Sequence, residues 1–284
     1  MKRAIIKNTS YIALVAVLLL AVGCQSVENE IVLPKQTTNS ITIGLTQTKT
    51  SLGTLENGVR KIFWSNGDCI AANGSTSSEA ILDAENSSVA TFDFESELTY
   101  PLNILYPASF YKDASTITLP AVQAAATASF ATNTLPMATS VASAGDAIKL
   151  SHLAGVIRLQ LKAQKDRDNT IRKVEFAGND GEQVSGDFVI NYDAVTLTPT
   201  SEAEADKKVA TRVMETLTVD TITDIFIVVP AQEYKNGFSV RVINSSGHYM
   251  DKKKSSGVKI RNGEILTMPE MEFIPNGTLI NVEL

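Results

Sequence analysis

Short segments in which apolar and polar residues alternate recur along this chain and favour a β-rich fold. In Ser40–Gln47, the side chains of Ile41, Ile43 and Leu45 share one face and small polar residues share the other, which predicts a half-buried strand. Gly155–Lys162 repeats the alternation, with an apolar core face of Ile157, Leu159 and Leu161 and an opposite face of Val156, Arg158 and Gln160. A period of two is typical of a strand, because successive side chains point to opposite faces. Before residue 140, no amphipathic helix longer than about two turns stands out.

Turn signals separate these segments. Asn57-Gly58, Asn66-Gly67 and Asp180-Gly181 each follow one strand-like stretch and precede another. Several short strands with turns between them indicate β-sandwiches. Ser140–Ala147 is small and polar, so we place a domain boundary there. The sequence therefore predicts an all-β fold with two tandem domains, at residues 40–145 and 146–284.

The first twenty-four residues predict the compartment. Lys2 and Arg3 precede an apolar run, Ile12–Val22, and Gly23-Cys24 follows at once. A basic start and a short apolar run are typical of a secretory signal, and the run is too short for a confident membrane span. The tetrad from residue 21 to Cys24 resembles a bacterial lipobox, which implies removal of residues 1–23 and lipidation (palmitate) of Cys24. An ordinary signal peptide with a chance cysteine is the alternative.

Residues 24–39 are polar and read as a tether between the lipid and the first domain. Glu28 and Glu30, just after the cysteine, loosely resemble the acidic signal that sends some lipoproteins to the outer face of the outer membrane; a solvated linker explains them as well. The expected location is the outer membrane, lipid-anchored and exposed at the cell surface.

Composition and motifs argue against several function classes. With 31 acidic and 25 basic residues and no basic stripe, nucleic acid is not an expected partner. Cys69 stands alone once Cys24 carries lipid, so no disulfide framework is expected, and it reads as a small strand residue facing the core. His152 and His248 lack partners at metal-ligand spacing. We expect no enzyme activity, no catalytic residue, no metal and no cofactor, although paired carboxylates far apart in sequence are not excluded.

A family resemblance rests on five motifs in order along the chain. They are Thr48–Gly53, Ile62–Asp68, Thr118–Gln123, Leu135–Ser140 and Leu150–Leu161. In this order and spacing they resemble the fimbrillin-like proteins of Bacteroidetes, lipoprotein precursors of type V pili and related surface proteins. The likeness covers nearly all of the chain after residue 40.

The resemblance implies two transthyretin-like β-sandwich domains and assembly by strand exchange. In this family a trypsin-like protease removes the first strand with the lipid, and a C-terminal segment of another subunit fills the groove. The resemblance implies a removable strand anchored by Ile41, Ile43 and Leu45. It implies protease cleavage at Lys49 or Arg60. The candidate donor residues are Ile280, Val282 and Leu284. The alternative is that the tail, including Met271 and Phe273, completes its own sandwich. The implied partners are other pilus subunits, the processing protease and the membrane, and the implied location is the fimbrium.

The alternative hypothesis is that the chain is a monomeric surface lipoprotein, an adhesin or tip protein that binds a glycan or a host protein. Trp64, Tyr100, Tyr106 and Tyr111 would form a platform for sugar rings if they were exposed, although aromatic residues in strands are more often core. Lys252–Lys254 reads as a solvated hairpin tip.

Overall fold

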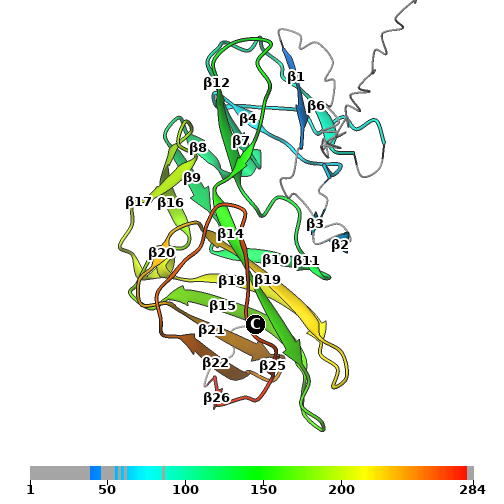
Figure 1. Ribbon diagram of the computed structural model, residues 1–284, viewed down its shortest axis with the longest axis vertical. Helices are drawn as coiled ribbons and strands as arrows, with labels where there is room; N and C mark the ends of the chain where they lie inside the picture. The colour runs from blue at the N-terminus through cyan, green and yellow to red at the C-terminus, as the bar shows by residue number, and fades with distance from the viewer. Residues whose placement is uncertain (1–38, 46–54, 57–58, 61–62, 85–86, 280–284) are drawn as a thin grey trace, which may run out of the picture. The chain divides into compact units, whose positions relative to one another are not determined.

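Strands dominate the computed structural model, which describes residues 39–45, 55–56, 59–60, 63–84 and 87–279 (Figure 1). The expected all-β class is confirmed. The helical elements within these residues are two short turns, η1 (Ala108–Phe110) and η2 (Glu204–Lys207). In this part of the chain no helix has the length and apolar character of a membrane span. The expected signal peptide lies outside the described residues.

The first core lies between a strand pair and a five-stranded sheet. β1 (Ser40–Gly44) pairs with β6 (Val89–Asp93). The sheet has the order β13-β12-β7-β4-β5. Its strands are β13 (Ser151–His152), β12 (Met137–Val141), β7 (Leu102–Tyr106), β4 (Ala71–Ala72) and β5 (Ser75–Thr76). Side chains from both sheets, such as Phe92, Ile104 and Met137, share one buried cluster.

The second core lies between a seven-stranded and a four-stranded sheet. The larger sheet consists, in order, of β11 (Ser129–Phe130), β10 (Val122–Ala126), β18 (Val209–Thr216), β15 (Thr170–Gly178), β21 (Phe238–Asn244), β22 (His248–Lys254) and β26 (Gly277–Thr278). The smaller consists of β19 (Thr223–Pro230), β14 (Ala154–Lys162), β24 (Ile265–Thr267) and β25 (Met271–Glu272), the last two parallel to β14. Figure 1 shows β18, β15, β21 and β22 side by side.

Three smaller sheets complete the described strands. One has the order β17-β16-β9-β8 and the others are two-stranded. Their members are β17 (Thr196–Pro199), β16 (Gly186–Asn191), β9 (Thr116–Leu119), β8 (Tyr111–Asp113), β2 (Leu55–Glu56) with β3 (Val59–Arg60), and β20 (Glu233–Tyr234) with β23 (Val258–Lys259).

Strand pairing crosses the position at which the sequence suggested a domain boundary. β9 pairs antiparallel with β16, and β10 pairs parallel with β18. The side-chain amide of Gln123 in β10 also hydrogen-bonds both backbone groups of Val228 in β19, at 2.7 and 3.0 Å. Segments from before and after residue 145 therefore build common sheets, while the division into domains stays a prediction.

The polar face expected for β14 is partly covered. Ile157, Leu159 and Leu161 enter the second core as the alternation predicted. Val156, on the opposite face, is also buried, because it packs in one cluster with Phe130 of β11 and with Leu135, which lies between β11 and β12. Further along the same face, Arg158 and Gln160 are half-buried, so this face of β14 is nowhere fully exposed at these three positions.

Candidate functional site

β1 is the element that the sequence singles out for exchange, and it is buried on both faces. Ile41 and Ile43 are fully buried and Leu45 nearly so, all within the first core. Thr42, on the opposite face, is only 4% exposed, and Gly44 is buried too. The expectation of a half-buried strand is therefore wrong for its second face, because alternation in sequence does not reveal what covers the polar side.

β6 is the only strand that pairs with β1 in the described part of the chain. The pair is antiparallel, with Ser40 opposite Asp93 and Gly44 opposite Val89. At its centre the hydroxyls of Thr42 and Thr91 lie 2.9 Å apart. The backbone N–H of Leu45 donates to the carbonyl of residue 88 at 2.7 Å and so extends the pairing beyond the strand.

Trp64 ties β1 to the rest of the first core. Its indole Nε1 donates to the carbonyl oxygen of Ile43 at 3.1 Å, and the side chain is 1% exposed. The ring stands edge-on to Phe92 and Tyr106, at centroid distances of 5.0 and 5.4 Å. Such pairs contribute about 0.5–1.5 kcal/mol beyond the area that they bury.

This burial overturns the aromatic platform that the sequence allowed. Trp64 and Tyr106 are both core side chains, at 1% and 0% exposure, so neither presents a face to a sugar. Tyr100 and Tyr111 are partly buried against two different clusters, so the four rings do not form one surface.

A buried carboxyl group supports the loop that carries Trp64. Tyr106 donates its hydroxyl proton to Asp68 Oδ1 at 2.8 Å, and the backbone N–H of Ser65 donates to Asp68 Oδ2 at 2.7 Å. Burial raises the pKa of Asp68, although its two hydrogen bonds act in the opposite direction. Burial also raises the pKa of Tyr106, and the neighbouring Asp68 carboxylate raises it further. Both acceptor oxygens are occupied within the protein, so the arrangement is structural.

The loss of β1 would remove a large part of the stability of the first core. Burying one Ile or Leu side chain contributes about 1.5–3 kcal/mol, so Ile41, Ile43 and Leu45 together contribute about 4.5–9 kcal/mol. The hydrogen bond from Trp64 adds about 0.5–1.5 kcal/mol. A whole domain is usually stable by about 5–15 kcal/mol. We call the space that β1 fills in the first core the slot. With the slot empty, the first core would be barely stable, and a strand that took the place of β1 would restore the lost burial.

The described part of the C-terminal region partly completes its own sandwich. Met271 pairs with Leu161 through β25, and Phe273 is fully buried in the second core. Beyond Pro275, β26 pairs with the start of β22, and the N–H of Leu279 donates to the carbonyl of Gly247 at 2.9 Å. The donor candidates Ile280, Val282 and Leu284 lie outside the described residues.

The remaining sequence candidates are placed as follows. Cys24 and Lys49 lie outside the described residues. Arg60 lies in β3, where its backbone is opposite Leu55. Cys69 is partly exposed, and burial is the main cause that raises the pKa of its thiol, which makes it a weak nucleophile.

The described residues hold no cluster of three or more His, Cys, Asp or Glu side chains that could bind a metal ion. His152 is buried and His248 is exposed at the start of β22. The sequence did not single out Asp68 or the pairing of Gln123 with Val228. Both interactions join residues far apart in the chain, so local sequence carries no signal for them.

No family model matches the sequence, and no curated protein matches it. Among solved structures, the chain is similar to a "putative cell adhesion protein" from Bacteroides ovatus, with TM-score 0.48, 12% identity and coverage of 87% of this chain and 100% of that one. A protein with the same description from Bacteroides uniformis gives TM-score 0.48 and 13% identity, covering 84% and 94%. The tip fimbrial protein Mfa3 from Porphyromonas gingivalis gives TM-score 0.30 and 12% identity, covering 75% and 80%.

Proposed function

We propose that this chain is a pilus subunit or pilus-associated surface lipoprotein whose first strand is exchanged for an extended segment of another subunit. The lipid at Cys24 would hold the precursor on the outer membrane. Cleavage by a trypsin-like protease would release the lipid together with β1. We also propose that the chain has no catalytic role and takes part in cell adhesion through the assembled fimbrium.

The observation that carries this proposal is the placement of β1. It is the first described strand, it pairs only with β6 among the described strands, and it fills the first core with three apolar side chains. Lys49 follows Leu45 by four residues, so a cut there would fall between β1 and β2 and would interrupt none of the described strands. An emptied sheet edge beside an apolar slot is the kind of surface to which an extended peptide adds.

The tail supplies a segment of the right pattern. Ile280-Asn281-Val282-Glu283-Leu284 presents apolar residues at the same spacing as Ile41-Thr42-Ile43-Gly44-Leu45. In a strand, alternate residues face the same side, so the two segments would offer nearly the same apolar groups to one slot. The tail of a second copy would therefore bring a similar set of apolar groups into the first core, with Asn281 and Glu283 at the positions of Thr42 and Gly44.

A monomeric glycan-binding role loses its main support. That reading relied on exposed aromatic rings, and Trp64 and Tyr106 are buried. No other observation favours it, so strand exchange remains the proposal.

Limited trypsin digestion of the purified precursor tests the proposal. We expect a new N-terminus after Lys49 or Arg60 and a ladder of polymers in electrophoresis without boiling. A matched variant, K49Q/R60Q/K61Q, removes every basic residue between Leu45 and Phe63 and should stay monomeric under the same treatment. A nine-residue peptide covering residues 276–284 should block polymer growth by filling the slot. A wild-type protein that is cut at either site and remains monomeric would contradict the proposal.

A further inference from the structure

A trough lies on the face of the seven-stranded sheet that points away from the second core. Its volume is about 370 Å³, and sites for small ligands usually measure about 300–1,000 Å³. One row of neighbouring residues crosses its floor, because Ala177 of β15 pairs with Ser239 of β21, which pairs with Lys253 of β22. Phe176 and Val240, next to this row in the chain, are buried in the second core. Successive residues of a strand face opposite sides, so the row faces outward.

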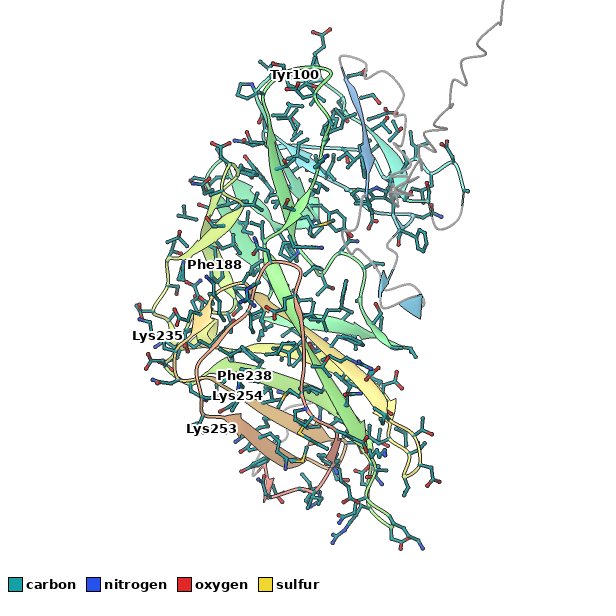
Figure 2. All side chains as sticks on the ribbon, in the orientation of Figure 1. Tyr100, Phe188, Lys235, Phe238, Lys253 and Lys254 are labelled. Atoms are coloured by element: carbon teal, nitrogen blue, oxygen red, sulfur yellow. The ribbon has the colours of Figure 1, made fainter. Side chains whose placement is uncertain are left out.

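Of the three consecutive lysines of β22, only the middle one belongs to this row. The hairpin tip that the sequence suggested for them is wrong, because the turn is at residues 245–247 and the lysines lie within the strand. Lys252 pairs with Val240 and Lys254 with Phe238, both core residues, so these two lysine side chains lie on the other side of the sheet. Figure 2 labels Lys253 and Lys254 on β22 and Phe238 on the neighbouring strand.

Two lysines border the trough on opposite sides. Lys208 has an extended backbone directly before the buried Val209 of β18, so its side chain lies on the outward face. Lys253 borders the trough on β22. Three strand spacings separate β18 from β22, which places the two lysine backbones about 14 Å apart. Both lysines are exposed, and neither forms an ion pair with a carboxylate in the part of the chain that the structure describes.

The two carboxylates at the trough are neutralised by cations of their own. Glu175 lies 2.8 Å from Lys173 Nζ. Asp251 accepts two hydrogen bonds from the Arg241 guanidinium, at 2.7 and 2.8 Å, and Arg241 also lies over the ring of Tyr249. The two lysines at its sides therefore give the trough a positive charge, although the whole chain has a net charge of -6. A hollow lined by one sign of charge attracts a ligand of the opposite sign.

The polar groups of the trough suit a ligand that carries both acidic groups and hydroxyls. The two ammonium groups can donate only, so they bind anionic oxygens. A carboxylate has about four lone-pair sites, so Glu175 and Asp251 keep acceptor positions for hydroxyl protons after their own ion pairs are made. The hydroxyl of Ser239 donates to Asn179 Oδ1 at 2.6 Å, and its oxygen can still accept. Sugars with carboxylate or sulfate substituents combine these two kinds of group.

We propose that this trough binds an acidic oligosaccharide, a short chain of sugars with carboxylate or sulfate groups. Its acidic groups contact Lys208 and Lys253. Its hydroxyls donate to Glu175, Asp251 and Ser239. The site uses no residue of β1, β6 or the tail, so it requires neither strand exchange nor a monomeric chain. Each subunit of the proposed fimbrium would carry one such site, and a long acidic polysaccharide that spans several subunits would bind more tightly than a short one.

Isothermal titration calorimetry of the intact, uncleaved chain tests the site. The probes are trigalacturonate, which carries carboxylates, and a heparin-derived tetrasaccharide, which also carries sulfates. We expect wild type to bind them and not to bind neutral maltotriose; binding of one acidic probe alone supports the proposal and identifies the acidic group. K208Q/K253Q should bind at least about tenfold more weakly, because it removes two charge-assisted contacts. A177L should weaken binding as well, because it fills the floor without changing the charge. Added salt should weaken the binding of wild type.

The matched control is K149Q/K235Q, which makes the same change in net charge at two exposed lysines that do not line the trough and should bind like wild type. The proposal is wrong if neither acidic probe binds, if maltotriose binds as tightly, or if K208Q/K253Q binds like wild type. Inorganic sulfate that binds as tightly as the tetrasaccharide would assign the trough to simple anions and contradict the proposal. Tighter binding of a hexaglutamate peptide would assign it to an acidic protein segment and contradict it too. Because the chain is not cleaved, none of these results depends on strand exchange.

Discussion

Replacing Ile43 by alanine tests how much β1 contributes to the first core. The side chain is fully buried between the two sheets, next to the indole whose Nε1 binds its carbonyl. A buried Ile→Ala substitution lowers the free energy of unfolding by about 2–5 kcal/mol, since it removes apolar contact and leaves a cavity. With little room to collapse between two sheets, we expect I43A in the upper half of that range.

Urea unfolding monitored by tryptophan fluorescence measures this loss of unfolding free energy in the first core selectively. Trp64 is the one tryptophan of the chain and lies in the first core, so its emission reports on that core. The control is V189A, which truncates an exposed apolar side chain on β16, 42% accessible, and should change stability by no more than about 0.5 kcal/mol.

The reasoning fails if I43A unfolds within about 0.5 kcal/mol of wild type. That result would mean that β1 contributes little to the first core, and an emptied slot would then need no replacement strand. If the prediction holds, I43A should also lose β1 to trypsin faster than wild type, because local opening exposes the cleavage segment more often.

Two further substitutions test contacts that local sequence does not predict. Because the folded pKa of Asp68 is raised by burial, its stabilising contribution is present below the unfolded value of about 3.9 and is lost as pH rises through the folded pKa. The free energy of unfolding of wild type relative to D68N should therefore fall as pH rises above about 4 in urea titrations, and a flat difference would contradict the assignment. Q123A should lower stability by about 2–4 kcal/mol, because it leaves the buried N–H and carbonyl of Val228 without their partner; a variant as stable as wild type would show that the pairing is dispensable.

Alternation in sequence identified the strands but not what covers them. Ile41 and Ile43 were predicted to share a buried face, and they do. Thr42 was predicted to face outward and is buried, since the polar face of a strand carries no local record of its neighbours. Val156 differs from expectation for the same reason: distant residues pack over it.

Local sequence patterns also did not predict the pairing between strands that lie far apart in the chain. The pairing of β10 with β18 joins residues such as Gln123 and Thr211, far apart in the chain, and no turn signal records it. The aromatic residues show the same limit, because the pattern that suggested Trp64 as a binding residue is equally compatible with a core position. The lysine run was placed in a turn because charge runs are often solvated, whereas the Ser-Gly signal just before it marks the real turn.

An intermolecular disulfide tests strand exchange most directly. In the exchanged state, Asn281 of one copy takes the place of Thr42, opposite Thr91, where the two native hydroxyls lie 2.9 Å apart. Directly opposed residues have Cβ atoms about 4.5–5.5 Å apart, close to the span of a disulfide. In a C69S background, trypsin-treated T91C/N281C should form polymers that persist on boiling and dissociate with reductant, while T91C/V282C should not, because a shift of one residue points the thiol to the other face. Failure of T91C/N281C to cross-link, or equal cross-linking by both pairs, would contradict the exchange of β1 for the tail of a second copy.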